Sequence, residues 1–114
     1  MTAEQIDSLL GYLPRFEQPD RTFITGPDYA DDVVEFFKLA EEWRIADYDP
    51  VEAGEMLESE ERIQQASLDQ VRSMLTYCLR GEQFNTGHWD FVLRSGQLPA
   101  LLRRLRELRR SLDS

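Results

Sequence analysis

The sequence predicts an all-α fold, a small irregular or orthogonal bundle of about four to five helices. Three observations lead to this prediction. Apolar residues recur at helical spacing in several segments, capping-box patterns open two of these segments, and no convincing pair of strands is evident. With 114 residues, of which 41% are hydrophobic, the chain is expected to form a single domain over residues 1–114 with its own core.

The N-terminal segment predicts a helix followed by a loop. Thr2 and Gln5 form a capping-box pattern, and the apolar spacing after them predicts a helix over about residues 3–13. Residues 15–27 contain Pro and Gly among polar residues, which is typical of a loop. One short extended segment is expected near residues 21–25, the only strand-like part of this loop.

Residues 28–45 predict the clearest helix of the first half. Its apolar residues form one stripe: Val33, Phe36, Phe37, Ala40 and Trp43. The positive end of the helix dipole would favour the acidic residues of its first turn: Asp28, Asp31 and Asp32. The pattern then ends, because Pro50 disfavours helix at Asp49. Residues 50–66 are polar and rich in Glu, with only a weak apolar pair in Met56 and Leu57, so short helical turns and mobility are expected there.

The second half predicts three helices. Ser67 and Gln70 form a second capping box, which opens a helix expected to end near Gly81. Its apolar stripe comprises Leu68, Val71, Met74, Leu75, Cys78 and Leu79. After a loop over residues 81–87, a short helix stops at Gly96 and turns three apolar residues inward: Trp89, Val92 and Leu93. The last segment predicts an amphipathic helix with the stripe Leu98, Leu101, Leu102, Leu105, Leu108 and Leu112.

The acidic composition restricts the partners that the sequence favours. A net charge of −9 and a pI near 4.5 argue against a general nucleic-acid or anionic-membrane binder. The charge is uneven, with −12 in residues 1–66 and +3 in residues 67–114. The acidic part could lie against the last helix, meet a basic protein partner or imitate a nucleic-acid surface. The last helix could contact nucleic acid through Arg103, Arg104, Arg106, Arg109 and Arg110.

The remaining composition favours a reduced, cytoplasmic environment. One Cys and one His provide neither an internal disulfide nor an evident zinc set, so we expect no cofactor and no metal. The N-terminus lacks the positive charge and apolar run of a secretory signal. Apolar runs such as residues 91–93 fall far short of the ~20 residues that cross a bilayer, so no membrane partner is expected. Cys78 is expected to be a buried thiol rather than a nucleophile.

The segment of residues 80–89 concentrates the residue types that carry chemistry. Its candidate functional residues are Arg80, Glu82, Phe84, Gly87, His88 and Trp89. In a structural interpretation, Arg80 satisfies the carbonyls of a helix end and pairs with Glu82. Phe84 then plugs the core, and Gly87 supplies a backbone angle that other residues resist. The helix that follows is capped by Asn85 or Thr86.

A functional interpretation assigns this segment to a small-ligand pocket. The helix dipole would disfavour the cationic form of His88, which could act with Glu82 as a general base. Alternatively, His88 could bind an anion alongside Arg80. A metal site needs more ligands than the segment offers.

A series of motifs runs through residues 75–108. They are Leu75-Thr76, Arg80-Gly81-Glu82-Gln83-Phe84, Gly87-His88, Gly96 and Leu102-Arg103-Arg104-Leu105. This order resembles an uncharacterised family of small bacterial proteins, whose pattern contains Arg-x-Glu-Arg-Phe followed by Gly-His. Gln83 stands where that family has Arg, and Asn85 stands where Cys is frequent. The resemblance covers about residues 67–108 and, loosely, Asp47-Tyr48-Asp49-Pro50, and it implies a helical domain without an established activity.

The sequence favours a protein-interaction module over an enzyme. A homodimer through the C-terminal leucine stripe is one form of this hypothesis, if residues 105–112 extend beyond the core. Trp43 and Trp89 share helix faces with aliphatic residues, so both are expected in the core. The main alternative is a small-ligand-binding or hydrolytic enzyme that uses Arg80, Glu82 and His88. A weaker alternative is nucleic-acid mimicry, or contact with nucleic acid through the C-terminal Arg helix.

Overall fold

Helices dominate residues 2–112, the part of the chain that the computed structural model describes. The elements follow in the order α1 (Ala3–Leu10), α2 (Leu13–Phe16), β1 (Ile24–Thr25), β2 (Asp28–Tyr29), α3 (Asp31–Glu41), α4 (Pro50–Leu57), α5 (Glu60–Gln64), α6 (Leu68–Phe84), α7 (His88–Arg94) and α8 (Gln97–Leu112). The predicted all-α class is confirmed. These helical segments outnumber those predicted, because residues 3–16 and residues 50–64 each form two short helices.

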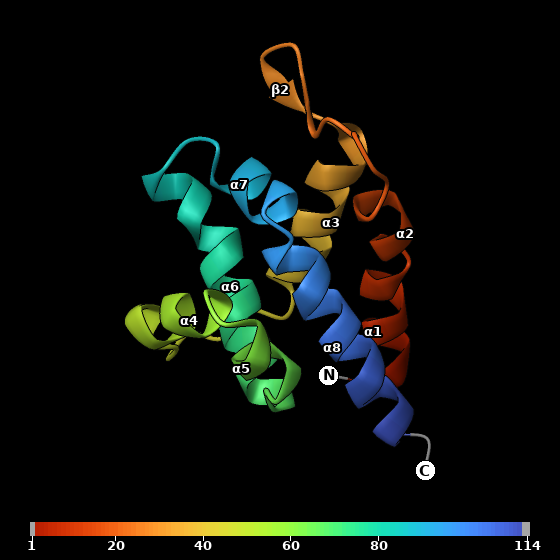
Figure 1. The fold of residues 1–114 in the computed structure, drawn as a ribbon, viewed down its shortest axis with the longest axis vertical. Helices are drawn as coiled ribbons and strands as arrows, with labels where there is room; N and C mark the ends of the chain where they lie inside the picture. Colours follow the sequence, from red (N-terminus) through yellow and green to blue (C-terminus); the bar gives the residue numbers. More distant parts are fainter. Residues whose placement is uncertain (1, 113–114) are drawn as a thin grey trace.

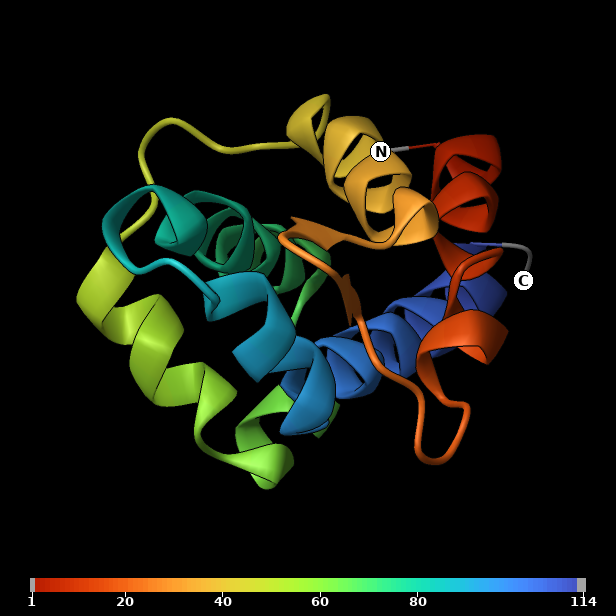
Figure 2. The ribbon, with the colours of Figure 1, turned by 90° about the horizontal axis from the view of Figure 1, so that it is seen from above.

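The two longest helices, α6 and α8, contact each other at the centre of the bundle. Both α1 and α2 pack against α8, while α4 packs against α6 on the opposite side, as Figure 2 shows from above. The short helix α7 contacts both α6 and α8, near the end of the bundle from which the hairpin projects (Figure 1). Every other helix is therefore positioned against α6, α8 or both.

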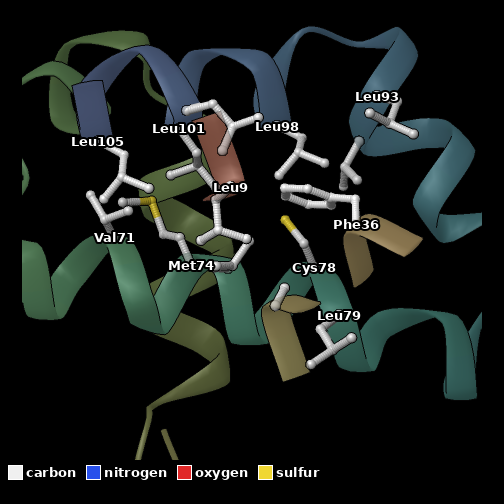
Figure 3. Close-up of a cluster of buried hydrophobic side chains, with 14 of the residues drawn as sticks. Leu9, Phe36, Val71, Met74, Cys78, Leu79, Leu93, Leu98, Leu101 and Leu105 are labelled. Carbon is white, nitrogen blue, oxygen red and sulfur yellow. The ribbon is translucent and has the colours of Figure 1, made fainter. Parts of the chain in front are cut away.

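The core lies between the facing surfaces of α6 and α8. Figure 3 shows side chains of other helices entering it, including Leu9 of α1, Phe36 of α3 and Leu93 of α7. Burying one such side chain contributes roughly 1.5–3 kcal/mol. The predicted stripes account for most of this core, although several of their members are only partly buried: Trp43, Leu68, Trp89 and Leu108. The side chain of Leu112 lies outside the described residues.

The first predicted helix divides into two, so its predicted end at residue 13 is wrong. The capping box of Thr2 and Gln5 is present and starts α1. The ring of Pro14 would clash with the carbonyl of Leu10 in a continuous helix, which explains why α1 ends at Leu10. Pro14 instead stands at the start of α2, where its missing N–H has no cost.

The extended segment predicted near residues 21–25 forms half of a short hairpin. Strand β1 pairs antiparallel with β2, in the register Ile24 to Tyr29. The turn between them has Gly26 at φ +64° followed by Pro27, the order of a type II′ turn. Because Asp28 belongs to β2, α3 begins at Asp31, and the prediction of Asp28 in its first turn is wrong.

The segment after α3 leaves the helix earlier than predicted and crosses α6. Helix α3 ends at Glu41 rather than near Ile45. The carbonyl of Trp43 accepts a hydrogen bond from Arg72 Nε at 3.2 Å, and the backbone N–H of Ile45 donates to Thr76 Oγ1 at 3.0 Å. These bonds attach the linker to α6. The chain then reaches Tyr48, which becomes part of the candidate site.

Residues 50–64 contribute more to the core than their polar composition indicates. The carboxylate of Asp49 accepts the backbone N–H groups that begin α4, and the hydroxyl of Ser59 does the same for α5. The buried residues of these helices are Ala53, Met56, Leu57 and Ile63. The predicted short helical turns are therefore two capped helices with an apolar face.

Helix α6 runs past its predicted end. The capping box of Ser67 and Gln70 is confirmed, but Gly81 lies inside the helix, which continues to Phe84. The predicted loop of residues 81–87 consequently shrinks to residues 85–87. Gly96, at φ +86°, separates α7 from α8 as predicted.

The acidic N-terminal helices and the Arg-rich last helix lie side by side. Arg109 donates from Nε to Asp7 at 3.0 Å, and Arg103 pairs with Glu17 at 2.8 Å. The proposed contact between the two charge regions is thus present. Among residues 2–112, no helix combines the length and apolar character that crossing a membrane requires.

Candidate functional site

The carboxylate of Glu82 joins three elements of the fold. Its Oε1 accepts hydrogen bonds from the hydroxyl of Tyr29 at 2.8 Å and from the backbone N–H of Trp89 at 3.0 Å. Its Oε2 accepts from the backbone N–H of Gly87, also at 3.0 Å. Glu82 therefore caps the start of α7 and connects α6 to the hairpin. The predicted caps, Asn85 and Thr86, are not used, because the chain reverses at Gly87 and brings its N–H groups back toward α6.

These contacts determine the ionisation of Glu82 and Tyr29. Burial raises the pKa of Glu82, but hydrogen bonds from Trp89, Gly87 and Tyr29 outweigh burial and hold the pKa below its usual value. Burial, together with the neighbouring Glu82 carboxylate, raises the pKa of Tyr29 to about 12. Glu82 is thus a stable anion whose hydrogen-bonding capacity is largely occupied, so it is poorly suited to act as a general base.

His88 packs its ring directly over the backbone of α6. An added Cβ at Gly81 would lie 2.1 Å from His88 Cδ2, so only glycine permits this approach. The ring makes an edge contact with Tyr77 at a centroid distance of 5.6 Å. Its Nε2 is buried and has no hydrogen-bond partner among residues 2–112. Burial lowers the pKa of His88 despite the opposing charge of Glu82.

Arg80 takes neither of the two structural roles that the sequence predicted. It lies within α6 rather than at its end, and it does not pair with Glu82, whose carboxylate is occupied by Tyr29 and α7. Its guanidinium carbon lies 5.7 Å from the ring centroid of Tyr48, a cation–π contact. Within the described part of the chain, Arg80 has no carboxylate partner.

The two aromatic candidates have different environments. The indole of Trp89 stacks on Phe37 at a centroid distance of 4.2 Å and donates to the carbonyl of Leu79, so it packs against the core as predicted. Phe84, in contrast, is 85% exposed, and the prediction that it plugs the core is wrong. Because α6 continues to Phe84, this side chain follows Tyr77 and Arg80 on one side of the helix instead of turning inward.

Phe84 belongs to a groove between α6, α7 and the start of α4. We call it the aromatic groove; its volume is about 220 Å³, and its lining includes Tyr48, Pro50, Tyr77, Arg80, Phe84 and His88. Gly81 and Asn85 complete the lining, so the groove contains one cation and no carboxylate. The side chains of Phe91 and Val51 are also largely exposed, at 53% and 69%. Phe91 lies near the ring of His88, and Val51 follows Pro50 in the chain.

A second cavity lies on the other side of Arg80, between α3, α6 and α7. Its volume is about 390 Å³. The apolar part of its lining comprises Val34, Phe37, Leu79 and Trp89, and the charged part comprises Lys38, Glu41, Arg80 and Glu82. Arg80 thus lines both hollows. Glu82 lines only this cavity, and His88 lines only the aromatic groove.

The arrangement offers little for hydrolysis. Glu82 and His88 are not joined by a hydrogen bond in the described residues, and Glu82 is engaged by α7. Cys78 is buried as predicted, and burial raises the pKa of its thiol to about 12, which suppresses the nucleophilic thiolate. No group of three or more potential metal ligands is formed by residues 2–112.

Sequence reasoning did not identify the side chains that contact residues 80–89. Tyr29 lies 53 residues before Glu82, and no pattern in the sequence connects them. Tyr48 and Tyr77 also line the groove without having been singled out as candidates. Tyr48 belongs to the Asp47–Pro50 segment that loosely resembles part of the family pattern, which was the available signal.

Comparison with known proteins places the chain in a family without assigning an activity. A family model described as a family of unknown function, DUF6508, matches residues 1–111. No curated protein and no solved structure matches the chain. The predicted resemblance to an uncharacterised family is confirmed, and the match extends well upstream of the motifs in residues 67–108.

Proposed function

Because the chain belongs to DUF6508, a family of unknown function, we propose from its own geometry that it acts as a protein-interaction module rather than as an enzyme. Its contact surface is the aromatic groove. A partner protein would insert an apolar or aromatic side chain there, with an acidic residue beside it. A reduced, cytoplasmic setting is compatible with the single buried thiol, Cys78.

The exposure of Phe84 at the edge of the aromatic groove carries this proposal. A single exposed apolar residue is ordinary, but Phe84 adjoins a hollow lined by two Tyr rings and a Pro. Rigid aromatic side chains around a concave surface are typical of residues that dominate binding energy at protein interfaces. Arg80 is the groove's only charged side chain, which favours an acidic residue in the partner.

Other hypotheses from the sequence have less support. The last helix buries its leucines from Leu98 to Leu105 within the chain, so this part of the stripe is not available for a dimer. Three of its arginines, Arg103, Arg104 and Arg109, contact carboxylates or a backbone carbonyl of the same chain. This engagement weakens the case for nucleic-acid contact. A homodimer is still compatible with the proposal if it forms through the aromatic groove.

Selection from a phage-displayed library of random dodecapeptides tests the proposal with a defined probe. Immobilised protein should enrich peptides that combine an aromatic residue with Asp or Glu. Addition of a selected peptide should shift the NMR signals of Tyr48, Tyr77 and His88. Phe84→Ser should weaken peptide binding by about tenfold or more. The matched control, Ile24→Ser, removes another exposed apolar side chain, one that does not line the groove, and should leave binding unchanged.

Two outcomes would contradict the proposed contact surface. If selected peptides bind Phe84→Ser as tightly as they bind the unaltered protein, or if their NMR shifts map outside the groove, the proposed surface is wrong. Light scattering over a range of concentrations identifies the homodimer version, because a rising mass that Phe84→Ser abolishes would make a second copy the partner.

A further inference from the structure

The cavity between α3 and α6 has the features of a small-molecule site. Its volume of about 390 Å³ falls within the range of about 300–1,000 Å³ that is typical of ligand pockets. Aromatic and aliphatic side chains supply most of its apolar lining, among them the stacked rings of Phe37 and Trp89. Such a lining suits a planar apolar group, which can stack on aromatic rings or meet their edges.

The carboxylates that line this cavity have partners within the protein, whereas the cations have no carboxylate partner among residues 2–112. Both carboxylates are engaged within the protein, since Glu41 pairs with Arg44 and Glu82 accepts hydrogen bonds from Tyr29 and α7. The two cations, Lys38 and Arg80, have no carboxylate partner among residues 2–112. The cation–π contact of Arg80 with Tyr48 leaves its charge in place.

Lys38 is exposed to solvent and Arg80 is partly buried, so both cations can meet a ligand that enters the cavity. A bound anion would pair with them. The nearby carboxylates of Glu41 and Glu82 would repel a doubly charged group more strongly than a singly charged one. The cavity therefore favours a monoanion over a phosphate dianion.

We propose that the cavity between α3 and α6 binds a small aromatic carboxylate. The ring system contacts Phe37 and Trp89, and the carboxylate lies toward Lys38 and Arg80. This site is separate from the aromatic groove and does not rest on the proposed interaction function, although Arg80 contributes to both. Lys38 lines only this cavity, and Phe84 lines only the groove, so each can be altered independently.

Titration with naphthalene-2-carboxylate, followed by ¹⁵N NMR, tests the site. Saturable shifts are expected at Lys38 and Leu79 and at the indole N–H of Trp89. Naphthalene-2-carboxamide, the neutral analogue, should bind at least about tenfold more weakly, because it lacks the charge. Lys38→Ala should weaken carboxylate binding by about three- to tenfold. Arg106→Ala, which changes the net charge equally on the exposed side of α8, should not alter it.

Two further variants separate the possible failures. Val34→Phe should fill the cavity and abolish binding of both probes, while the partial exposure of Val34 leaves room for the fold to persist. Phe84→Ser should leave carboxylate binding unchanged. Equal binding of the carboxamide, shifts confined to the aromatic groove, or no saturable shift at about 10 mM probe would each overturn the proposal.

Discussion

At the scale of single residues, Glu82 determines how the candidate site is held together. One carboxylate accepts the hydroxyl of Tyr29 and the backbone N–H groups of Gly87 and Trp89. Each bond involves an ionised acceptor in a partly buried position, where such bonds are stronger than neutral ones. Glu82 thus performs the capping expected of Asn85 or Thr86, and because its carboxylate is occupied, Arg80 does not pair with it.

Replacing Glu82 by Gln should lower the free energy of unfolding by about 1–3 kcal/mol, because the charge-assisted bonds to α7 and the hairpin weaken together. Urea unfolding at pH 7 measures the loss. The pKa of Glu82 is lowered from 4.5, so its contribution is complete above pH 4.5 and is lost as pH falls through the folded-state pKa. The difference between the two proteins should therefore shrink in acid.

A matched control is Glu107→Gln, which removes a carboxylate paired with Arg104 on the exposed side of α8. It should change the free energy of unfolding by no more than about 0.5 kcal/mol. Equal effects of the two substitutions would mean that Glu82 holds α7 no more firmly than a surface ion pair does.

His88 should titrate below its ordinary pKa of 6.5, because burial of its ring disfavours the charged form. The unfolded chain then binds a proton at higher pH than the folded chain. The stability that neutral His88 contributes is complete above about pH 6.5 and is lost as pH falls from there toward the folded-state pKa. The NMR signal of its Cε1–H reports the midpoint directly, since His88 is the only His.

The charge of Glu82 raises the pKa of His88, so Glu82→Gln should move the midpoint to still lower pH. A midpoint at or above 6.5 in the unaltered protein would show that the ring is not buried against α6 in solution.

At the scale of elements, the sequence was sufficient for the helix faces but not for several helix ends. Capping boxes correctly predicted the starts of α1 and α6, because both partners lie within four residues of each other. The predicted end of α6 at Gly81 was wrong. A glycine can also stand inside a helix where a neighbouring group packs so closely that no side chain would fit. Here His88 occupies that space, and this contact depends on how α7 folds back onto α6.

This explanation predicts that Gly81→Ala destabilises the protein by about 1–3 kcal/mol, although Ala favours helix by about 1 kcal/mol over Gly. The added Cβ would force the ring of His88 out of its place. In the His88→Ala background the clash is absent, so Gly81→Ala should be neutral or stabilising there. A double-mutant cycle by urea unfolding measures this difference. Additive effects would contradict the proposed contact.

At the scale of the whole molecule, the ion pairs between α8 and the N-terminal region lie apart from the most exposed apolar side chain, Phe84. The arginines of α8 meet Asp7 and Glu17 of the N-terminal region, which reduces the charge contrast between the two halves of the sequence. The exposed apolar side chains lie elsewhere, with Phe84 at the end of α6. Composition predicted the charge contrast, but its compensation and the position of the apolar surface depend on tertiary contacts between distant segments.

The buried core and the exposed groove should respond differently when a side chain is truncated to Ala. Leu101→Ala should lower the free energy of unfolding by about 2–5 kcal/mol, because Leu101 is buried between α6 and α8. Phe84→Ala should change it by no more than about 0.5 kcal/mol, since Phe84 is almost fully exposed. Urea unfolding of both variants at one pH makes the comparison. A large loss for Phe84→Ala would mean that the ring packs against the fold in solution and that the aromatic groove is closed. A negligible loss would show that the ring of Phe84 contributes little to folding.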